Sequence, residues 1–371
     1  MKLSAFDDFP FHQVPTPFAT AATSDAHFND GYFCAFYTDG WYFCTGLRLH
    51  PNVNVIDAWV SAARNNRQCA IRASRALHPD YGELSVGPIT FEIIEPMKTI
   101  RVSAASEIAG MEIDVVLEAQ SPPFIEERYQ HFKYGAVVND LIRYTQVCRA
   151  NGRAIHKGEP LAIADWYAMR DHSWGVRSSM AMPTGIRGIN KEHERAKRRA
   201  LRLWVPFQVS DHCGFFNTHE SSDGEALDFE GRLDYADGRC VKLVGMRHEL
   251  EYLDGTERPL GGKLELEGED GDTREYELKL AGTPADVQGG GYYGGWSDQL
   301  GPGIYRGEEV IEHDDYDVSP GPIKTGPPHV PEAKRLGPTE YPMHMSGPDG
   351  ATGMAHFEHT ISGPYPRYGF E

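Results

Sequence analysis

The sequence predicts an all-β protein that is built from two similar domains. Apolar and polar residues alternate with a period of two through most of the chain, as in strands with one buried face. Tight-turn dipeptides separate these segments, including Asp39-Gly40, Asn151-Gly152 and Asp237-Gly238. The rhythm recurs in both halves of the 371 residues, a length sufficient for two domains. Many short strands joined by tight turns favour a barrel or a sandwich over alternating strands and helices.

The strands of the first half follow an irregular N-terminal stretch. The segment before Asn151-Gly152 is interpreted as a strand whose hairpin partner starts at Arg153, because Asn-Gly is a strong hairpin signal. The last strand of this half leads directly into residues 171–177. The expected strands cover residues 31–38, 41–49, 53–62, 67–75, 89–95, 99–106, 111–119, 141–150 and 161–169.

Two segments of the second half break the strand pattern. In residues 190–203, a candidate N-cap, Asn190, is followed by a run rich in charged helix formers. We therefore expect one short helix there. Residues 319–350 are rich in Pro and Gly, and we expect an irregular connection over the surface. We place the domain boundary so that the domains are 1–170 and 171–371. The expected strands cover residues 201–209, 213–218, 226–235, 240–246, 263–267, 276–280 and 354–361.

Composition restricts the classes of partner. The chain has 54 acidic and 36 basic residues and a formal net charge of −18, which argues against nucleic acid and anionic membranes as partners. The six cysteines include no C-x-x-C pair, and the first residues lack the apolar core of a signal peptide. No stretch approaches the roughly 20 apolar residues of a membrane helix. We expect a cytoplasmic protein, with its oligomeric state left open.

The sequence Asp-His-Ser-Trp-Gly-Val-Arg at residues 171–177 is the most informative motif of the chain. In an extended strand, His172 and Trp174 point to one face, and Asp171 and Ser173 point to the other. A proton carrier beside an aromatic wall suits chemistry on an apolar substrate. The alternative is structural, with a hydrogen-bonded histidine in a barrel core and Trp174 as packing.

The Asp-His-x-Trp-Gly stretch between two β-rich halves resembles the carotenoid 1,2-hydratase and AttH-like superfamily. The resemblance implies two lipocalin-like (calycin) β-barrels in tandem. It also implies hydration, isomerisation or cyclisation at a carbon–carbon double bond of a hydrophobic polyene, terpenoid or lipid-like substrate, without a cofactor. Hydratases of this group use a further Tyr and Asp beyond the His-Trp pair. Here that span carries the expected basic helix, and Asp211 is a weak candidate, which leaves isomerisation and cyclisation beside hydration.

Roles follow from this resemblance. We expect His172 to carry the proton, Trp174 to stabilise a developing cation through its ring face, and Asp171 to orient neighbouring groups. Residues that are candidates for substrate contact are Tyr32, Trp41, Tyr292, Trp296 and Arg177, although Arg177 could instead pair with a carboxylate. The competing hypothesis is a non-catalytic calycin-like carrier of a hydrophobic ligand.

No cofactor or metal site is predicted. The glycine-rich run at residues 289–296 has no preceding parallel strand and no following helix, so a bulged strand or a loop at a barrel mouth is favoured over a nucleotide site. The histidines do not occur at the spacings of known metal motifs. An acid–base pair converging on one pocket would favour the enzyme, and a purely apolar pocket with one neutral histidine would favour the carrier.

Overall fold

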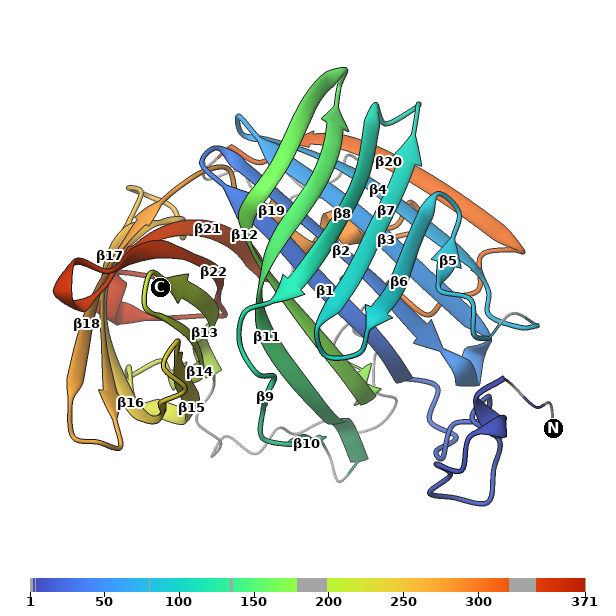
Figure 1. Ribbon diagram of the computed structural model, residues 1–371, viewed down its shortest axis with the longest axis horizontal. Coiled ribbons are helices and arrows are strands. Elements are labelled where there is room, and N and C mark those ends of the chain that lie inside the picture. Colours follow the sequence, from blue (N-terminus) through green and yellow to red (C-terminus); the bar gives the residue numbers. More distant parts are fainter. Residues whose placement is uncertain are drawn as a thin grey trace.

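The computed structural model describes residues 3, 5–79, 81–133, 136–178, 199–319 and 338–370. These residues form two antiparallel sheets and a few short 3-10 turns (Figure 1). The predicted all-β class is therefore confirmed. No helix in the described ranges is long and apolar enough to cross a membrane.

The first sheet is an open, strongly curved half-barrel of 13 strands. Its strands are antiparallel, and β9 and β10 pair with β11 at its side. In spatial order the strands are β20 (Glu309–Asp317), β4 (Arg67–Ala76), β3 (Val55–Arg64), β2 (Trp41–His50), β1 (Phe28–Thr38), β12 (Glu159–Arg177), β11 (Ala136–His156), β8 (Met111–Ala119), β7 (Thr99–Ser106), β6 (Ile89–Glu95) and β5 (Ser85–Val86), with β9 (Phe124–Ile125) and β10 (Tyr129–Lys133).

The second sheet closes into a barrel because β18 also pairs with β21. Closure removes the exposed edges that an open sheet would present. The strands are β13 (Arg199–Val209), β14 (His212–Ser221), β15 (Ala226–Tyr235), β16 (Cys240–Tyr252), β17 (Pro259–Gly268), β18 (Thr273–Leu280), β21 (Thr339–Ser346) and β22 (Thr352–Ile361), with the short β19 (Ala285–Asp286) beside β21.

Two of the three tight-turn dipeptides named above do join consecutive strands. Asp39-Gly40 joins β1 to β2, and Asp237-Gly238 joins β15 to β16, each with a glycine at positive φ. The hairpin predicted at Asn151-Gly152 is wrong, because β11 runs on to His156 and the turn follows there. Gly152 instead marks a bulge at φ 149°, where a Cβ would lie 2.1 Å from the backbone oxygen of Asp114 in β8.

Two further expectations need correction. Residues 199–203 of the predicted helix belong to β13, because Leu201 and Leu203 alternate into the core of the barrel, and residues 190–198 lie outside the described ranges. Within the predicted irregular connection, Thr339–Ser346 forms β21, and residues 320–337 lie outside the described ranges. The buried alternation of Tyr341, Met343 and Met345 outweighs the neighbouring Pro and Gly.

The two sheets do not correspond exactly to the two halves of the chain. β12 crosses residue 170 without interruption, and β20 returns from the second half to pair with β4. The predicted domains 1–170 and 171–371 stay a prediction about folding units. The predicted strand at 354–361 corresponds to β22.

Both faces of the first sheet are covered. Its concave face encloses one apolar core, with Phe36, Phe43 and Ile71 among its members. The opposite face packs on the barrel and on residues 285–296, and this second layer contains Phe33, Trp59, Trp204 and other aromatic residues. Figure 1 shows the barrel beside the curved sheet, with β11 and β12 nearest to it.

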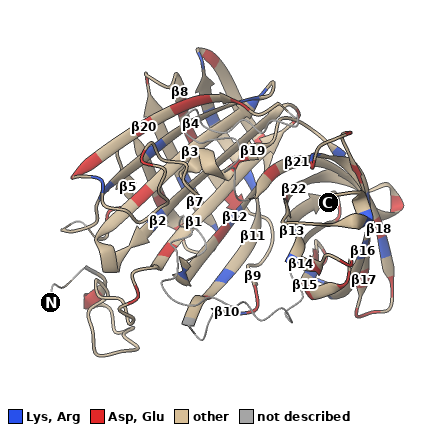
Figure 2. Cartoon of the chain, turned by 180° about the vertical axis from the view of Figure 1, so that it is seen from behind, with Lys and Arg blue, Asp and Glu red and all other residues tan. Residues whose placement is uncertain are grey.

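Charges of both signs are spread over the strands, and acidic residues concentrate on β20 (Figure 2). Arg72 of β4 is fully buried beneath this strand and forms ion pairs with Glu312 and Asp314. Its Nη1 atom donates a hydrogen bond of 2.9 Å to the carbonyl oxygen of Gly289. One cation thus joins β4, β20 and the glycine-rich segment. Of the two predicted forms of that segment, a bulged strand or a loop, it is a loop that opens with a buried 3-10 turn, η4 (Val287–Gly290).

We predict that Arg72→Met destabilises the fold by about 3 kcal/mol, because it leaves two partly buried carboxylates without their cation. Urea unfolding measures the change. The control is Arg247→Met, which removes an exposed arginine paired with Glu265 and Glu267 and should destabilise the fold far less than Arg72→Met. Equal losses in the two variants would contradict the bridging role of Arg72.

Candidate functional site

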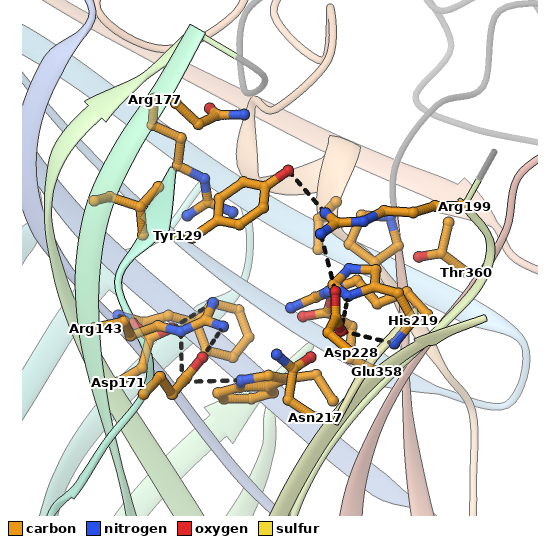
Figure 3. Close-up of a pocket in the computed structure, with 18 of the residues that line it drawn as sticks. Tyr129, Arg143, Asp171, Arg177, Arg199, Asn217, His219, Asp228, Glu358 and Thr360 are labelled. Atoms are coloured by element: carbon orange, nitrogen blue, oxygen red, sulfur yellow. Dashed lines mark hydrogen bonds and ion pairs between the residues drawn. The ribbon is translucent and has the colours of Figure 1, made fainter. Parts of the chain in front are cut away.

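A cavity of about 590 Å³ lies between the half-barrel and the closed barrel. The volume is in the range of sites that bind small organic ligands. One wall comes from β1, β2, β11 and β12 and the opposite wall from β13, β14, β15 and β22, while Val287, Tyr292 and Tyr293 add to the lining. Figure 3 shows the two walls facing each other.

The register of β12 decides which motif residues reach this cavity. Asp171 and Arg177 line it, together with Arg143 of the neighbouring β11. His172 and Trp174 share one face, as predicted, but that face points away from the cavity. Of the motif residues, Asp171 therefore faces this cavity and the His-Trp pair does not, and the catalytic role expected of His172 and Trp174 stays a prediction.

His172 and Trp174 lie on the concave side of the first sheet. The Nε2 atom of His172 is 2.6 Å from Oδ1 of Asp30, and its ring centre is 4.4 Å from that of Tyr32. Trp174 is 38 % exposed at this face, and Tyr144 meets His172 edge-on. His172 and Asp30 thus form a histidine–aspartate pair that the sheet separates from the cavity.

The remaining predicted contact residues are dispersed. Tyr292 lines the cavity, as does Arg177. Tyr32 lies beside His172, and Trp41 packs on Phe43 in the core of the first sheet. Trp296 is buried beneath the guanidinium groups of Arg72 and Arg306. Tyr32, Trp41 and Trp296 are not among the residues that line the cavity.

The barrel wall presents two rows of side chains that cross adjacent strands. The first row contains Thr360, Arg202, His219 and Asp228, and the second contains Glu358, Trp204, Asn217 and Glu230. These positions alternate with residues such as Leu201 and Phe216 that fill the barrel interior. The outer face of the barrel is therefore polar where it meets the cavity.

His219 and Asp228 form a hydrogen-bonded pair on this wall. The Nδ1 atom of His219 is 2.7 Å from Oδ1 of Asp228, and the other oxygen of Asp228 accepts from Arg199 at 3.0 Å. Tyr129 in turn accepts from Arg199 at 2.8 Å. Burial lowers the pKa of His219, with Arg202 and Arg199 acting in the same direction, so the imidazole is neutral near pH 7.

Glu230 lies two residues further along β15 on the same face. Burial, reinforced by the nearby carboxylate of Glu126, raises its pKa to about 7. The backbone N–H of Glu127 and the side-chain amide of Asn217 donate to its two oxygens at 2.8 and 3.3 Å and partly oppose this rise. A large fraction of Glu230 is therefore protonated near neutral pH.

A buried ion pair stands at the base of the cavity. Arg143 donates to Glu126 through two nitrogens, with Nε to Oε1 at 2.6 Å. Thr145 and the indole N–H of Trp204 also donate to Oε1 of Glu126, at 2.7 and 3.1 Å. The network joins β11 of the first sheet to β13 of the barrel, so it holds the two walls in a defined relation.

Asp171 is held on the same wall. The backbone N–H of Phe33 donates to it at 3.2 Å, and a nitrogen of Arg143 lies 3.8 Å away. Burial raises the pKa of Asp171, although Arg143 and Arg48 oppose the shift. In the described ranges, no three His, Cys, Asp or Glu side chains gather in the manner of a metal site.

Sequence reasoning missed the histidine and carboxylates of the barrel wall. The available signal was the alternation of Asn217 with His219 and of Asp228 with Glu230 on two strands joined by a tight turn. This pattern is also typical of an ordinary solvated strand face. Only the packing of that face against the first sheet turns it into a cavity wall.

Comparison with solved structures shows the fold. The crystal structure of an AttH candidate from Nitrosomonas europaea is 13% identical, has a TM-score of 0.52, and matches over 95% of this chain and 98% of its own. Kievitone hydratase from Nectria haematococca is 11% identical with a TM-score of 0.48, over 92% and 93% of the two chains. CghA is 9% identical with a TM-score of 0.45, over 90% and 88%. The predicted resemblance to the AttH-like superfamily is confirmed as a likeness of fold.

Sequence comparison leads to a family without an assigned activity. None of the curated proteins matches the chain. A family model described as a family of unknown function, DUF8625, matches residues 3–371, which is nearly the full length. The chain therefore belongs to the DUF8625 family.

Proposed function

We propose that the protein is an acid–base enzyme that acts on a carbon–carbon double bond of a substrate bound between the two barrels. The observation that carries this proposal is the presence of a proton acceptor, His219, and a proton donor, Glu230, on one cavity wall. Two ionisable groups with oppositely displaced pKa values are a common basis for assigning base and acid roles. The reaction class agrees with the one that the family resemblance implies.

His219 is prepared to act as the base. Its Nδ1–H donates to Asp228, which leaves the lone pair of Nε2 to accept a proton. Asp228 fixes the orientation of the ring and stabilises the imidazolium that forms, and Arg199 and Tyr129 fix Asp228. General acid–base assistance of this kind contributes roughly 10²–10⁴ in rate.

Glu230 is prepared to act as the acid. In a hydration, His219 takes a proton from water, the water oxygen bonds to one alkene carbon, and Glu230 gives its proton to the other carbon. The proton on His219 then returns to Glu230 through solvent, so that one water is consumed and both groups are restored. In an isomerisation, His219 removes a proton from one carbon and Glu230 protonates another. Phe33, which lines the cavity, is the aromatic side chain that we propose to stabilise positive charge that develops in either case, since the Trp204 ring already lies under the guanidinium of Arg143.

A non-catalytic carrier is the competing function. Such a carrier is favoured by a cavity lined by apolar residues with one neutral histidine, as in many lipocalin-type barrels. The present cavity contains arginines, carboxylates and a histidine–aspartate pair in addition to aromatic residues. Charged groups inside a cavity are costly to bury, so a site that retains them is better matched to chemistry than to storage.

The reaction is tested by incubating the protein with fractionated metabolite extracts in D₂O. Hydration yields a compound heavier by one water, and isomerisation or cyclisation yields an isomer that has acquired deuterium from the solvent. Mass spectrometry of the extract before and after incubation detects both. A ligand that is bound but recovered without deuterium or added water would support the carrier.

We predict that His219→Ala lowers kcat by about 10² or more, because it removes the base while leaving the fold intact. The matched control is His172→Ala, which breaks the other histidine–aspartate pair on the far side of the first sheet. The control should retain turnover, and melting temperatures of both variants report on folding. Loss of turnover in His172→Ala alone would restore the catalytic role that the sequence predicted for His172 and Trp174.

The shifted acid also predicts a pH dependence of stability. The pKa of Glu230 rises from 4.5 to about 7 on folding, so its stabilising contribution is complete below pH 4.5 and is lost as the pH rises through about 7. The shift corresponds to about 3 kcal/mol, which solvent screening of this partly exposed group reduces to about 1–2 kcal/mol.

Glu230→Gln should therefore be more stable than the parent protein at pH 8 and equally stable near pH 4.5, as measured by urea unfolding at each pH. Glu83→Gln changes an exposed loop glutamate and serves as the control with no pH-dependent difference. A pH-independent effect of Glu230→Gln would show that Glu230 titrates normally, and would remove it as the acid.

A further inference from the structure

We propose that the cavity binds its substrate by an anionic group, a carboxylate or phosphate, held between Arg177 and Arg48. The substrate class is then an unsaturated amphiphile with a charged head and an apolar body. This inference rests on the proposed function for the location of the reacting bond, but not for the anion site itself. It adds a charged head group to the hydrophobic terpenoid, polyene or lipid-like substrate that the sequence led us to expect, with Arg177 already a candidate contact.

Arginines line much of the cavity, and most of them have a carboxylate partner. Arg143 is paired with Glu126, Arg199 with Asp228, Arg202 with Glu358, and Arg128 with Asp140. Within each of these four pairs, the carboxylate compensates the positive charge of the arginine. They also leave the four arginines oriented by the protein and unavailable to recognise an additional anion.

Arg177 and Arg48 differ from this set. Among the described residues, no carboxylate lies within ion-pair distance of either guanidinium group. Arg48 is only 4 % exposed, its Nη1 atom donates to the neutral side chains of Asn29 at 2.7 Å and Ser173 at 3.3 Å, and its Nε atom has no partner. The charge of Asp171 interacts with both guanidinium groups at longer range, but this carboxylate accepts a hydrogen bond from the backbone N–H of Phe33 and lies 3.8 Å from Arg143.

The environment of Arg177 favours an incoming anion. Burial, together with repulsion from Arg48, lowers its pKa, while Tyr293 and Tyr292 act in the opposite direction. An anion that entered the cavity would relieve this repulsion, and the planar guanidinium fork matches the geometry of a carboxylate or phosphate. A buried and a partly buried cation that lack an ion-paired carboxylate are costly unless a ligand compensates them.

The two walls also define an orientation for the bound molecule. Figure 3 shows Arg177 on the β12 wall, with His219 and Asp228 across the cavity on the barrel wall. Phe33, Leu141 and Trp204 provide apolar lining. An anionic head at Arg177 therefore leaves the unsaturated body to extend toward His219 and Glu230.

A pair of fluorescent probes that differ in one charged group tests the anion site. 1-Anilinonaphthalene-8-sulfonate carries a sulfonate, and N-phenyl-1-naphthylamine has the same ring system without it. We predict that Arg177→Met weakens binding of the sulfonate by about tenfold or more, since hydrogen bonds to a charged group are lost. Binding of the neutral probe should be unchanged, and Arg48→Met should show the same selectivity.

Arg247→Met, which removes an exposed arginine of the barrel, is the matched control and should alter neither probe. Competition by dodecanoate, dodecyl phosphate and dodecanol then separates carboxylate from phosphate recognition, with the alcohol expected to compete least. Equal loss of both probes in Arg177→Met, or no loss of the sulfonate, would overturn the anion site.

The same titrations separate this inference from the proposed function. His219→Ala should bind the sulfonate probe as the parent protein does, because His219 is not part of the anion site. If that variant loses turnover while Arg177→Met binds both probes normally, the catalytic proposal stands and the anion site fails. If Arg177→Met selectively loses the sulfonate while His219→Ala retains turnover, the anion site stands and the catalytic assignment fails.

Discussion

The antiparallel register of β12 between β1 and β11 determines how the rest of the molecule is arranged. Because this sheet is covered on both faces, each residue of β12 contributes either to the concave core or to the layer against the barrel. A shift of one residue would exchange the two sets completely. The backbone hydrogen bonds that pair β12 with β1 and β11 therefore decide which side chains of β12 line the cavity.

Buried charge is the second organising feature. The pair of Glu126 and Arg143 joins the half-barrel to the barrel through Trp204, and Arg72 joins β4 to β20 and to the glycine-rich turn. Such pairs contribute little net stability compared with apolar packing, but removing one partner leaves an uncompensated charge. The Glu126–Arg143 pair therefore specifies the relative position of the two sheets, which forms the cavity, whereas Arg72 fixes β20 and the glycine-rich turn on the first sheet.

Two of the histidine–aspartate pairs, His172 with Asp30 and His219 with Asp228, show how the surroundings of a pair decide its chemical role. His172 with Asp30 lies among Tyr32, Tyr144 and Trp174 on the concave face of the first sheet. His219 with Asp228 faces a cavity that also contains an acid with a raised pKa. Local sequence marks the first pair through the motif around Trp174, whereas the alternation around the second is also that of an ordinary solvated strand face.

The sequence by itself determined the all-β class, most of the strands and several hairpins, because period-two alternation and Asp-Gly turns are local properties. It also determined that His172 and Trp174 share a face. Only the tertiary structure decided which face of β12 meets the cavity, that the strand predicted at 201–209 already begins at Arg199, that residues 339–346 form a strand, and that Asn151-Gly152 is a bulge. These outcomes depend on partners distant in the chain, such as β8 behind Gly152 and the barrel core behind Leu201 and Met343. His219 and Glu230 became a candidate site for the same reason, since the packing of one sheet on another buries them and shifts their pKa values.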